Sequence, residues 1–208
     1  MAIEYITEAL KLPNLIEPVT NPAVWYVQCE TDVKASATAM MILNYVRHDQ
    51  RKVGLLFTKS CDSKYHCAHE YAGAGEQLEK YTGGIAVVNV DWPLIIQMET
   101  LPLGVSMLHE LGHAKQFFDR PSLFYMLALL AGGFYNESGE FESAHDNERA
   151  EVAKVATPRA TTFNKNPKPG YTGDSAKKRG KEAIENENLA LHEIPICKEL
   201  KLKWREKY

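Results

Sequence analysis

The sequence predicts an α+β fold, in which a small mixed sheet packs against a central amphipathic helix and further helices. Two short runs rich in valine, isoleucine and leucine, at 52–59 and 83–92, are typical of buried strands. Several longer segments repeat their apolar residues at intervals of three and four, as helices on a core do. A chain of 208 residues can bury one core, so we expect a single domain over 1–208.

The N-terminal part, residues 1–50, is expected to be mainly helical. The segment "IEYITEALKL" has apolar residues at helical spacing and ends before Pro13. A stronger helix is predicted at 34–49, where alanine, methionine, isoleucine, leucine and valine form a broad face. The strand at 52–59 follows. We interpret the next segment, "SCDSKYHCAHE", as a surface loop and not as a second metal site, because its ligand spacing fits no standard finger.

The second half of the chain is predicted to begin with a strand and continue with helices. The strand at 83–92 opens on two glycines, and the helix at 99–118 follows it. The apolar stretch 121–131 is typical of a buried helix, and 143–156 begins with an S-x-x-D capping box. Three prolines, three glycines and many basic residues indicate a long surface loop at 157–181.

Composition excludes several classes of protein. The net charge of -3 and the pI near 6.2 provide no broad basic surface for nucleic acid. The first thirty residues lack the basic start and continuous apolar stretch of a cleavable secretory signal, and the apolar run Leu123 to Tyr135 is too short to cross a bilayer. Four scattered cysteines indicate a reducing compartment. We therefore expect no nucleic-acid partner and no membrane span.

The stretch "LHELGHAKQ" carries the chemistry of the chain. On a helix, His109 and His113 project from one face, so both imidazoles can reach a single zinc ion. Glu110 lies about 100° further round, where it can act on a zinc-bound water without being a ligand. Gly112 and Ala114 leave room for a neighbouring backbone. This is the H-E-x-x-H arrangement of zinc peptidases.

A catalytic zinc needs a third protein ligand and an open position. Asp119 is one candidate, but no glycine at 116 bends the chain back to bring it to the metal. The helix at 143–156 is the better source, because Glu148 and Glu151 share its apolar stripe and a buried glutamate is costly unless paired or metal-bound. We choose Glu148 as ligand, with Glu151 or Asp146 orienting a histidine.

Four stretches together resemble the bacterial effector zinc metallopeptidases of the NleD type: "GGIAVVNVDW", "LHELGHAKQ", "NERAEVAK" and "ENENLALHEIPICKELKLKWREKY". The resemblance covers about residues 80–208 and implies a zincin-like fold, one Zn²⁺ per chain, the histidine pair and Glu148 as ligands, and Glu110 as base. It also implies injection into the cytosol of a host cell and cleavage of host signalling proteins. The segment "NERAEVAK" lacks the family's usual following glycine, which leaves Glu148 against Glu151 open, and "ENENLALHEI" has leucine and alanine where an arginine is common.

We therefore expect a zinc-dependent endopeptidase, a secreted bacterial effector or toxin, in which Glu110 assists attack of zinc-bound water on a peptide bond of a host protein. The peptide substrate is expected to lie antiparallel along an exposed edge of the strand 83–92. A further donor should stabilise the oxyanion. The candidates, which sequence does not rank, are Tyr171, His192, Arg205 and Tyr208.

Two alternatives stay open. The strand followed by an AHELGH-like helix is also similar to the ImmA/IrrE-like peptidases, which cleave repressors in the bacterial cytoplasm, although no helix-turn-helix is apparent here. A non-enzymatic adaptor with a structural zinc site is the other alternative. It would close the metal with four protein ligands and would not need Glu110.

Overall fold

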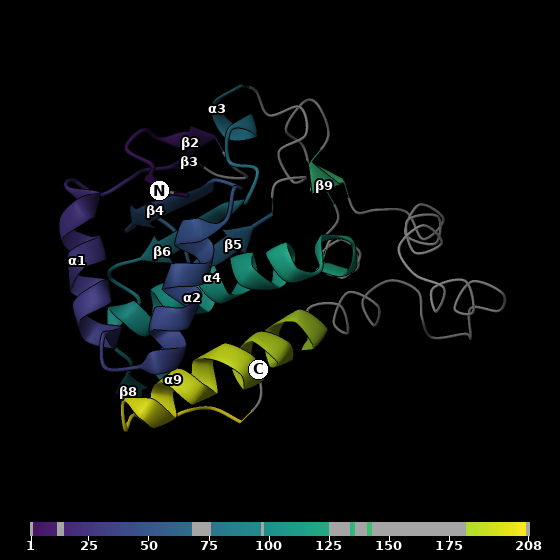
Figure 1. Cartoon of the computed structure of the whole chain (residues 1–208). Helices are drawn as coiled ribbons and strands as arrows, with labels where there is room; N and C mark the ends of the chain where they lie inside the picture. The colour runs from purple at the N-terminus through teal and green to yellow at the C-terminus, as the bar shows by residue number, and fades with distance from the viewer. Residues whose placement is uncertain are drawn as a thin grey trace, which may run out of the picture.

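The computed structural model describes seven stretches of the chain: 2–11, 15–67, 76–96, 98–124, 134–135, 141–142 and 182–206. Its main sheet contains β1 (Ile3–Tyr5), β4 (Val53–Thr58), β5 (Lys64–His66) and β6 (Ile85–Asn89). The spatial order is β1-β4-β6-β5, with β1, β4 and β6 parallel and β5 antiparallel to β6 (Figure 1). Among the described residues, β5 is therefore the edge strand on this side of the sheet.

The two central strands are buried on both faces, as parallel strands usually are. Successive side chains point to opposite faces. Leu55 and Phe57 belong to the core shared with the large helices, whereas Leu56 faces a smaller core beneath a hairpin. That hairpin joins β2 (Leu10–Lys11) and β3 (Leu15–Ile16). Burial on both faces fixes the register of the sheet, because a slip of one residue would exchange the two cores.

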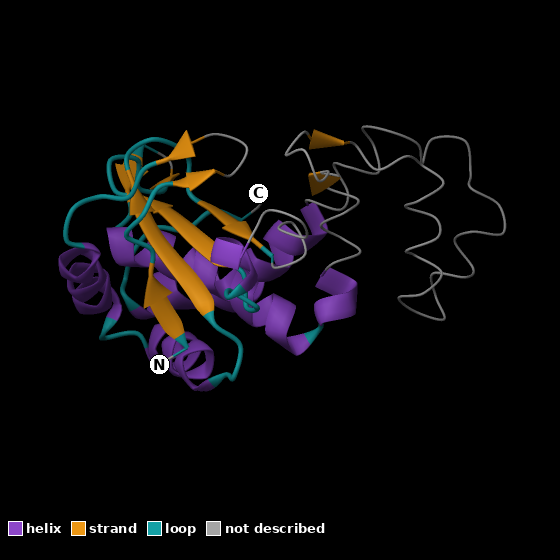
Figure 2. Ribbon diagram, turned by 90° about the horizontal axis from the view of Figure 1, so that it is seen from above, coloured by secondary structure: helices purple, strands orange, loops and turns teal. Residues whose placement is uncertain are grey.

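Helices cover the first of these faces. They are α1 (Pro22–Val33), α2 (Ala37–His48), α4 (Leu103–Asp119) and a C-terminal helix made of 182–188, the π-helical turn η2 (Leu189–Glu193) and α9 (Ile194–Glu199). Helix α4 is almost wholly buried, because it lies between the sheet and the C-terminal helix and also packs on α1 and α2 (Figure 1). Figure 2 shows from above how the strands lie across the helices.

The remaining described elements are short. They are α3 (Glu76–Glu79), the antiparallel pair β7 (Ile95–Ile96) and β8 (Glu99–Thr100), and the antiparallel pair β9 (Phe134–Tyr135) and β10 (Phe141–Glu142). No helix among the described residues is long and apolar enough to cross a membrane.

The predicted α+β class, with a small mixed sheet and several helices, is confirmed. The predictions at 34–49, 52–59 and 83–92 correspond to α2, β4 and β6. Of the helix predicted at 121–131, residues 121–124 are described and are helical. The predicted helix 143–156 and the loop 157–181 lie outside the described residues.

Four local predictions are wrong. The first segment, "IEYITEALKL", forms strands and no helix, because Ile3 to Tyr5 complete the ladder of β4 and tertiary pairing overrides a weak helical pattern. The helix at 99–118 begins only at Leu103, after β8 and Pro102. The "SCDSKYHCAHE" segment contains β5, not only a loop. The strand 83–92 has no free edge, since β6 lies between β4 and β5.

Candidate metal centre

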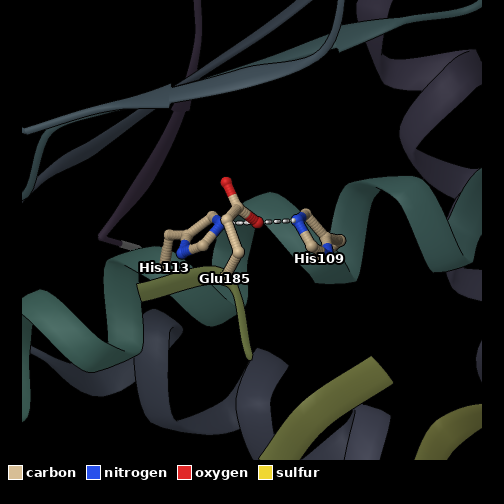
Figure 3. Close-up of side chains that lie close together, drawn as sticks. All are labelled: His109, His113 and Glu185. Carbon is tan, nitrogen blue, oxygen red and sulfur yellow. Dashed lines mark hydrogen bonds and ion pairs between the residues drawn. The ribbon is translucent and has the colours of Figure 1, made fainter. Parts of the chain in front are cut away.

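Two histidines of α4 and one glutamate of the C-terminal helix meet in the interior. His109 and His113 are buried, and their ring centroids lie 4.9 Å apart with the planes nearly perpendicular. The Glu185 Oε2 atom lies 3.2 Å from His109 Nε2 and 3.4 Å from His113 Nε2 (Figure 3). Among the described residues this is the only group of three such side chains whose ligand atoms converge, all within 4.8 Å of one another.

The spacing of these atoms fits a metal ion. Zinc binds imidazole nitrogen and carboxylate oxygen at about 2.0–2.2 Å in tetrahedral geometry, which places neighbouring ligand atoms about 3.4 Å apart. The two distances from Glu185, 3.2 and 3.4 Å, match that separation. Two imidazoles and one carboxylate are a donor set that zinc accepts in catalytic sites. Two of the three separations among the ligand atoms therefore suit one zinc ion, and the third lies within 4.8 Å.

The other ring nitrogen of each histidine is already occupied. His109 Nδ1 lies 2.8 Å from Glu193 Oε2, and His113 Nδ1 lies 2.8 Å from Gln116 Oε1. Both oxygens only accept hydrogen bonds, so each Nδ1 donates its hydrogen. In a neutral ring with its hydrogen on Nδ1, the Nε2 lone pair is directed towards Glu185. The hydrogen bonds at Nδ1 therefore favour the tautomer that a metal ion at Nε2 requires, once any proton on Nε2 has been displaced.

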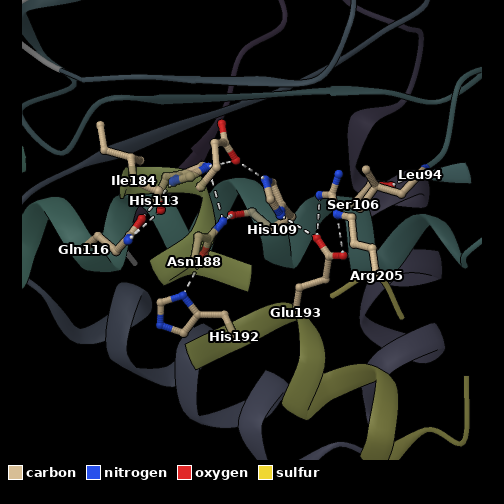
Figure 4. A network of polar contacts seen from close by, with 11 residues as sticks. Leu94, Ser106, His109, His113, Gln116, Ile184, Asn188, His192, Glu193 and Arg205 are labelled. Atoms are coloured by element: carbon tan, nitrogen blue, oxygen red, sulfur yellow. Dashed lines mark hydrogen bonds and ion pairs between the residues drawn. The ribbon is translucent and has the colours of Figure 1, made fainter. Parts of the chain in front are cut away.

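Each acceptor is itself held in place. Gln116 Nε2 donates to the Ile184 carbonyl at 3.1 Å and to Glu187 Oε2 at 2.8 Å. Arg120 in turn forms an ion pair with Glu187. On the other side, Arg205 binds both oxygens of Glu193. The hydrogen bonds therefore continue outward from both histidines to the C-terminal part of the chain (Figure 4).

Gly112 makes the contact between the two helices possible. Asn188 Nδ2 donates to the His109 carbonyl at 2.8 Å and lies 3.2 Å from His113 Nε2, while Asn188 Oδ1 accepts from His192 Nδ1 at 2.7 Å. A Cβ atom at Gly112 would lie only 2.2 Å from Asn188 Oδ1. The expectation that the small residue lets a neighbour approach is confirmed at this position.

The π-helical turn brings two carboxylates of one helix to the same imidazole. In a regular α-helix, Glu193 would stand about 80° round the axis from Glu185, eight residues earlier. A π-helical turn takes up one extra residue, so Glu193 occupies roughly the angle of a seventh residue, about 20° from Glu185. Consequently Glu185 contacts Nε2 of His109 and Glu193 contacts Nδ1 of the same ring.

The charges of the metal-free centre are strongly coupled. Burial lowers the pKa of His109, but the hydrogen bonds that its ring donates to Glu185 and Glu193 outweigh this effect and raise the pKa to about 10. Burial opposes ionisation of Glu185, yet its hydrogen bonds with His109 and His113 hold the pKa of that carboxyl well below its usual range. In the metal-free protein, a proton on His109 therefore compensates the negative charge of the buried carboxylates. A bound metal cation would compensate the same charge and displace that proton.

Glu110 is buried beside this group. Burial raises the pKa of its carboxyl, and the charges of His109 and His113 oppose that rise only in part. No hydrogen bond to the Glu110 carboxyl is formed by the part of the chain that the structure describes. A buried carboxyl without such a bond is costly and needs a functional reason.

The structure brings together some of the predicted site residues. His109 and His113 lie on one face of α4, and Glu110 lies beside them. Asp119 lies at the end of α4, where its carboxylate binds Tyr45 and Lys115 and not the histidines. His192 and Arg205 contact Asn188 and Glu193, away from the metal-facing atoms. The remaining candidates lie outside the described residues: Glu148, Glu151, Asp146, Tyr171 and Tyr208.

Sequence reasoning missed Glu185 and Glu193. In the stretch "ENENLALHEI", Glu185, Asn188 and His192 stand at i, i+3 and i+7, and helical spacing places them in one polar stripe. These side chains alternate with the buried Ile184 and Leu189. A polar stripe next to apolar residues on a helix indicates buried polar partners.

Comparisons with protein-family models, with curated proteins and with solved structures find no match. The assignment of a function therefore depends on the chemistry of this centre.

Proposed function

We propose that the protein is a zinc-dependent peptidase whose metal ligands are His109, His113 and Glu185. The observation that carries the proposal is the buried Glu110 carboxyl, which lies beside a set of three ligands and receives no hydrogen bond from the described residues. A structural zinc site closes with four protein ligands and has no use for such a group. Three ligands and an adjacent carboxylate are the composition of a hydrolytic site.

Zinc bound to His109, His113 and Glu185 would supply a Lewis acid that polarises the scissile carbonyl and increases the acidity of water. Glu110 acts as general base, and burial raises the pKa of its carboxyl in the metal-free protein. Its carboxylate takes a proton from the attacking water molecule and then delivers it to the nitrogen of the leaving amine. Glu193 and Gln116 keep the histidine rings in place during these steps.

We place the substrate on the side of the centre where β5 lies. Tyr65 of β5 stacks on His113, with ring centroids 6.3 Å apart, so the strand passes directly beside the centre. A peptide bound there would bring its scissile carbonyl close to the three ligands and to Glu110. The resemblance to effector peptidases favours a host signalling protein as substrate, reached by injection into the host cell.

The proposal is tested by metal content and cleavage in the same preparations. We expect about one zinc per wild-type chain by elemental analysis, with loss of zinc in His113→Ala and Glu185→Ala. Digestion of a denatured protein mixture, followed by mass spectrometry of new N-termini, should show cleavage by the wild type.

Glu110→Gln is the matched variant, because it preserves the shape of the side chain and replaces none of the three ligands. It should bind zinc as the wild type does and produce no new N-termini. Equal cleavage by Glu110→Gln would refute the peptidase mechanism. Full zinc binding without cleavage by the wild type would favour the adaptor.

A further inference from the structure

The carboxylate of Glu193 is fully buried and held by three hydrogen bonds from two partners. Its side chain is 0% exposed, and Oε2 lies 2.8 Å from both His109 Nδ1 and Arg205 Nη2. Arg205 Nε donates to Oε1 at 3.0 Å, so the guanidinium binds both oxygens. The position and orientation of this carboxylate are thereby determined by Arg205 on one side and by the imidazole on the other.

A buried ion pair of this kind is poorly explained by stability alone. Apolar residues of similar volume stabilise a core as well as or better than a buried pair of charges. His113 also shows that a neutral acceptor is enough to fix a ring, because Gln116 does so through its amide oxygen. A charged acceptor at His109 therefore indicates a task beyond packing.

Arg205 reaches this position through a reversal of the chain. The backbone turns at Lys201, whose φ of 59° lies in the left-handed region, and Leu202 N donates to the Cys197 carbonyl at 2.8 Å. The segment 202–206 consequently runs back beside the helix, and Arg205 meets a residue twelve positions earlier. Nearby, Lys203 pairs with Glu99 at the surface. The segment is thus held at two points, by Arg205 on Glu193 (Figure 4) and by Lys203 on Glu99.

We infer that Glu193 is a positioning residue for the metal ligand His109, and that Arg205 makes the C-terminal segment a working part of the metal site. The inference rests on the proposed metal-binding function. The Glu193 carboxylate keeps the hydrogen of His109 on Nδ1, orients the ring, and increases the basicity of Nε2 towards a cation. Arg205 holds the carboxylate against that nitrogen by its two-point contact.

The test uses Co²⁺ and Zn²⁺ with the full chain. Affinity is measured by competition with a chromophoric chelator, and the Co²⁺-loaded protein is studied by proton NMR. The wild type should show two exchangeable, paramagnetically shifted ring N–H resonances, one from each histidine ligand. Glu193→Ala should weaken metal binding by about 10–100-fold and lose one of these resonances. Gln116→Ala should lose the other, which assigns the pair.

Further variants separate positioning from general damage. Glu193→Gln retains an acceptor and should weaken binding less than Glu193→Ala, and it replaces the alanine variant if that one fails to fold. Arg205→Lys keeps the charge without the two-point contact. Its metal affinity should lie between that of the wild type and that of Arg205→Gln. Lys203→Gln removes the same charge from the same segment at an exposed pair and should bind metal like the wild type.

Two results would overturn the inference, and they differ from each other. Glu193 variants that bind Co²⁺ within threefold of the wild type and retain both ring resonances would refute the positioning role while leaving the metal site intact. A folded wild type that binds neither Co²⁺ nor Zn²⁺ would refute the proposed function and this inference with it.

Discussion

Substitution of Gly112 by alanine tests the contact that joins α4 to the C-terminal helix. The added Cβ would lie 2.2 Å from Asn188 Oδ1 and 2.8 Å from His192 Nδ1, whereas real Cβ contacts are essentially never shorter than 3.0 Å. The Asn188 side chain must therefore shift, and because it is fully buried and hydrogen-bonded to both helices, we expect the helix that carries it to move with it. Since Glu185 lies one turn before Asn188 on that helix, its carboxylate should move away from the histidines.

The cost can be worked out from these contacts. Forcing a methyl group into a packed site costs about 1–3 kcal/mol. The hydrogen bonds from Asn188 to the His109 carbonyl and from His192 to Asn188 contribute about 1 kcal/mol each and would be lost. Alanine returns about 1 kcal/mol through its higher helix propensity. We therefore expect Gly112→Ala to lower the free energy of unfolding by about 2–4 kcal/mol.

The assay is urea denaturation of the metal-free protein, together with Zn²⁺ affinity by chelator competition. Both stability and metal affinity should fall, because a centre displaced by more than about 0.5 Å loses its productive geometry. The control is the same substitution in the Asn188→Ala background, where the nearer of the two obstructing atoms is absent. There Gly112→Ala should cost at least about 1 kcal/mol less, on the order of a contact coupling energy. Equal cost in both backgrounds would refute this account of the contact.

Three further predictions concern the pH dependence of metal affinity, the pH dependence of stability, and a helix cap. Because the pKa of His109 is raised from 6.5 to about 10 in the metal-free protein, a metal must displace its proton, and Co²⁺ affinity should rise about tenfold per pH unit from pH 7 to 9. A flat profile in chelator competition would contradict this proton displacement. By the same shift, His109 stabilises the metal-free fold fully below pH 6.5 and loses that contribution as pH rises through about 10, as urea midpoints should show. Ser36 Oγ caps α2 by accepting from Ala39 N at 3.0 Å, and it donates to Glu199. Ser36→Ala should therefore lower the free energy of unfolding in urea by about 1–2 kcal/mol. The control Thr31→Ala removes an exposed hydroxyl and should lower it little.

Local patterns in the sequence predict those parts of this protein whose structure depends on residues close by in the sequence. The apolar runs of β4 and β6 are recognisable because both faces of each strand are buried. The histidine pair is recognisable because two residues four apart always share a helical face. By contrast, β1 is a strand only because β4 lies beside it, and no local pattern contains that partner.

The proposed third ligand is a case of the same limit. Glu185 lies 76 residues from His109 along the chain, and the apolar stripe at 143–156 favoured Glu148 and Glu151 instead. Glu193 reaches the same ring only through a π-helical turn, which breaks the periodicity on which face assignments depend. The identity of a ligand set is therefore a property of tertiary packing, while the presence of a ligand pair can be local.

The separation between His109 and Glu185 has a mechanical consequence. A metal ion bound at once to α4 and to the C-terminal helix is a cross-link that closes a loop of 76 residues. The entropy removed from the unfolded chain by such a cross-link grows with the length of the loop, as it does for a disulfide. A bound metal ion would then act as a reversible cross-link between distant segments. Its removal by a chelator would lower the stability of the fold whether or not a substrate is present.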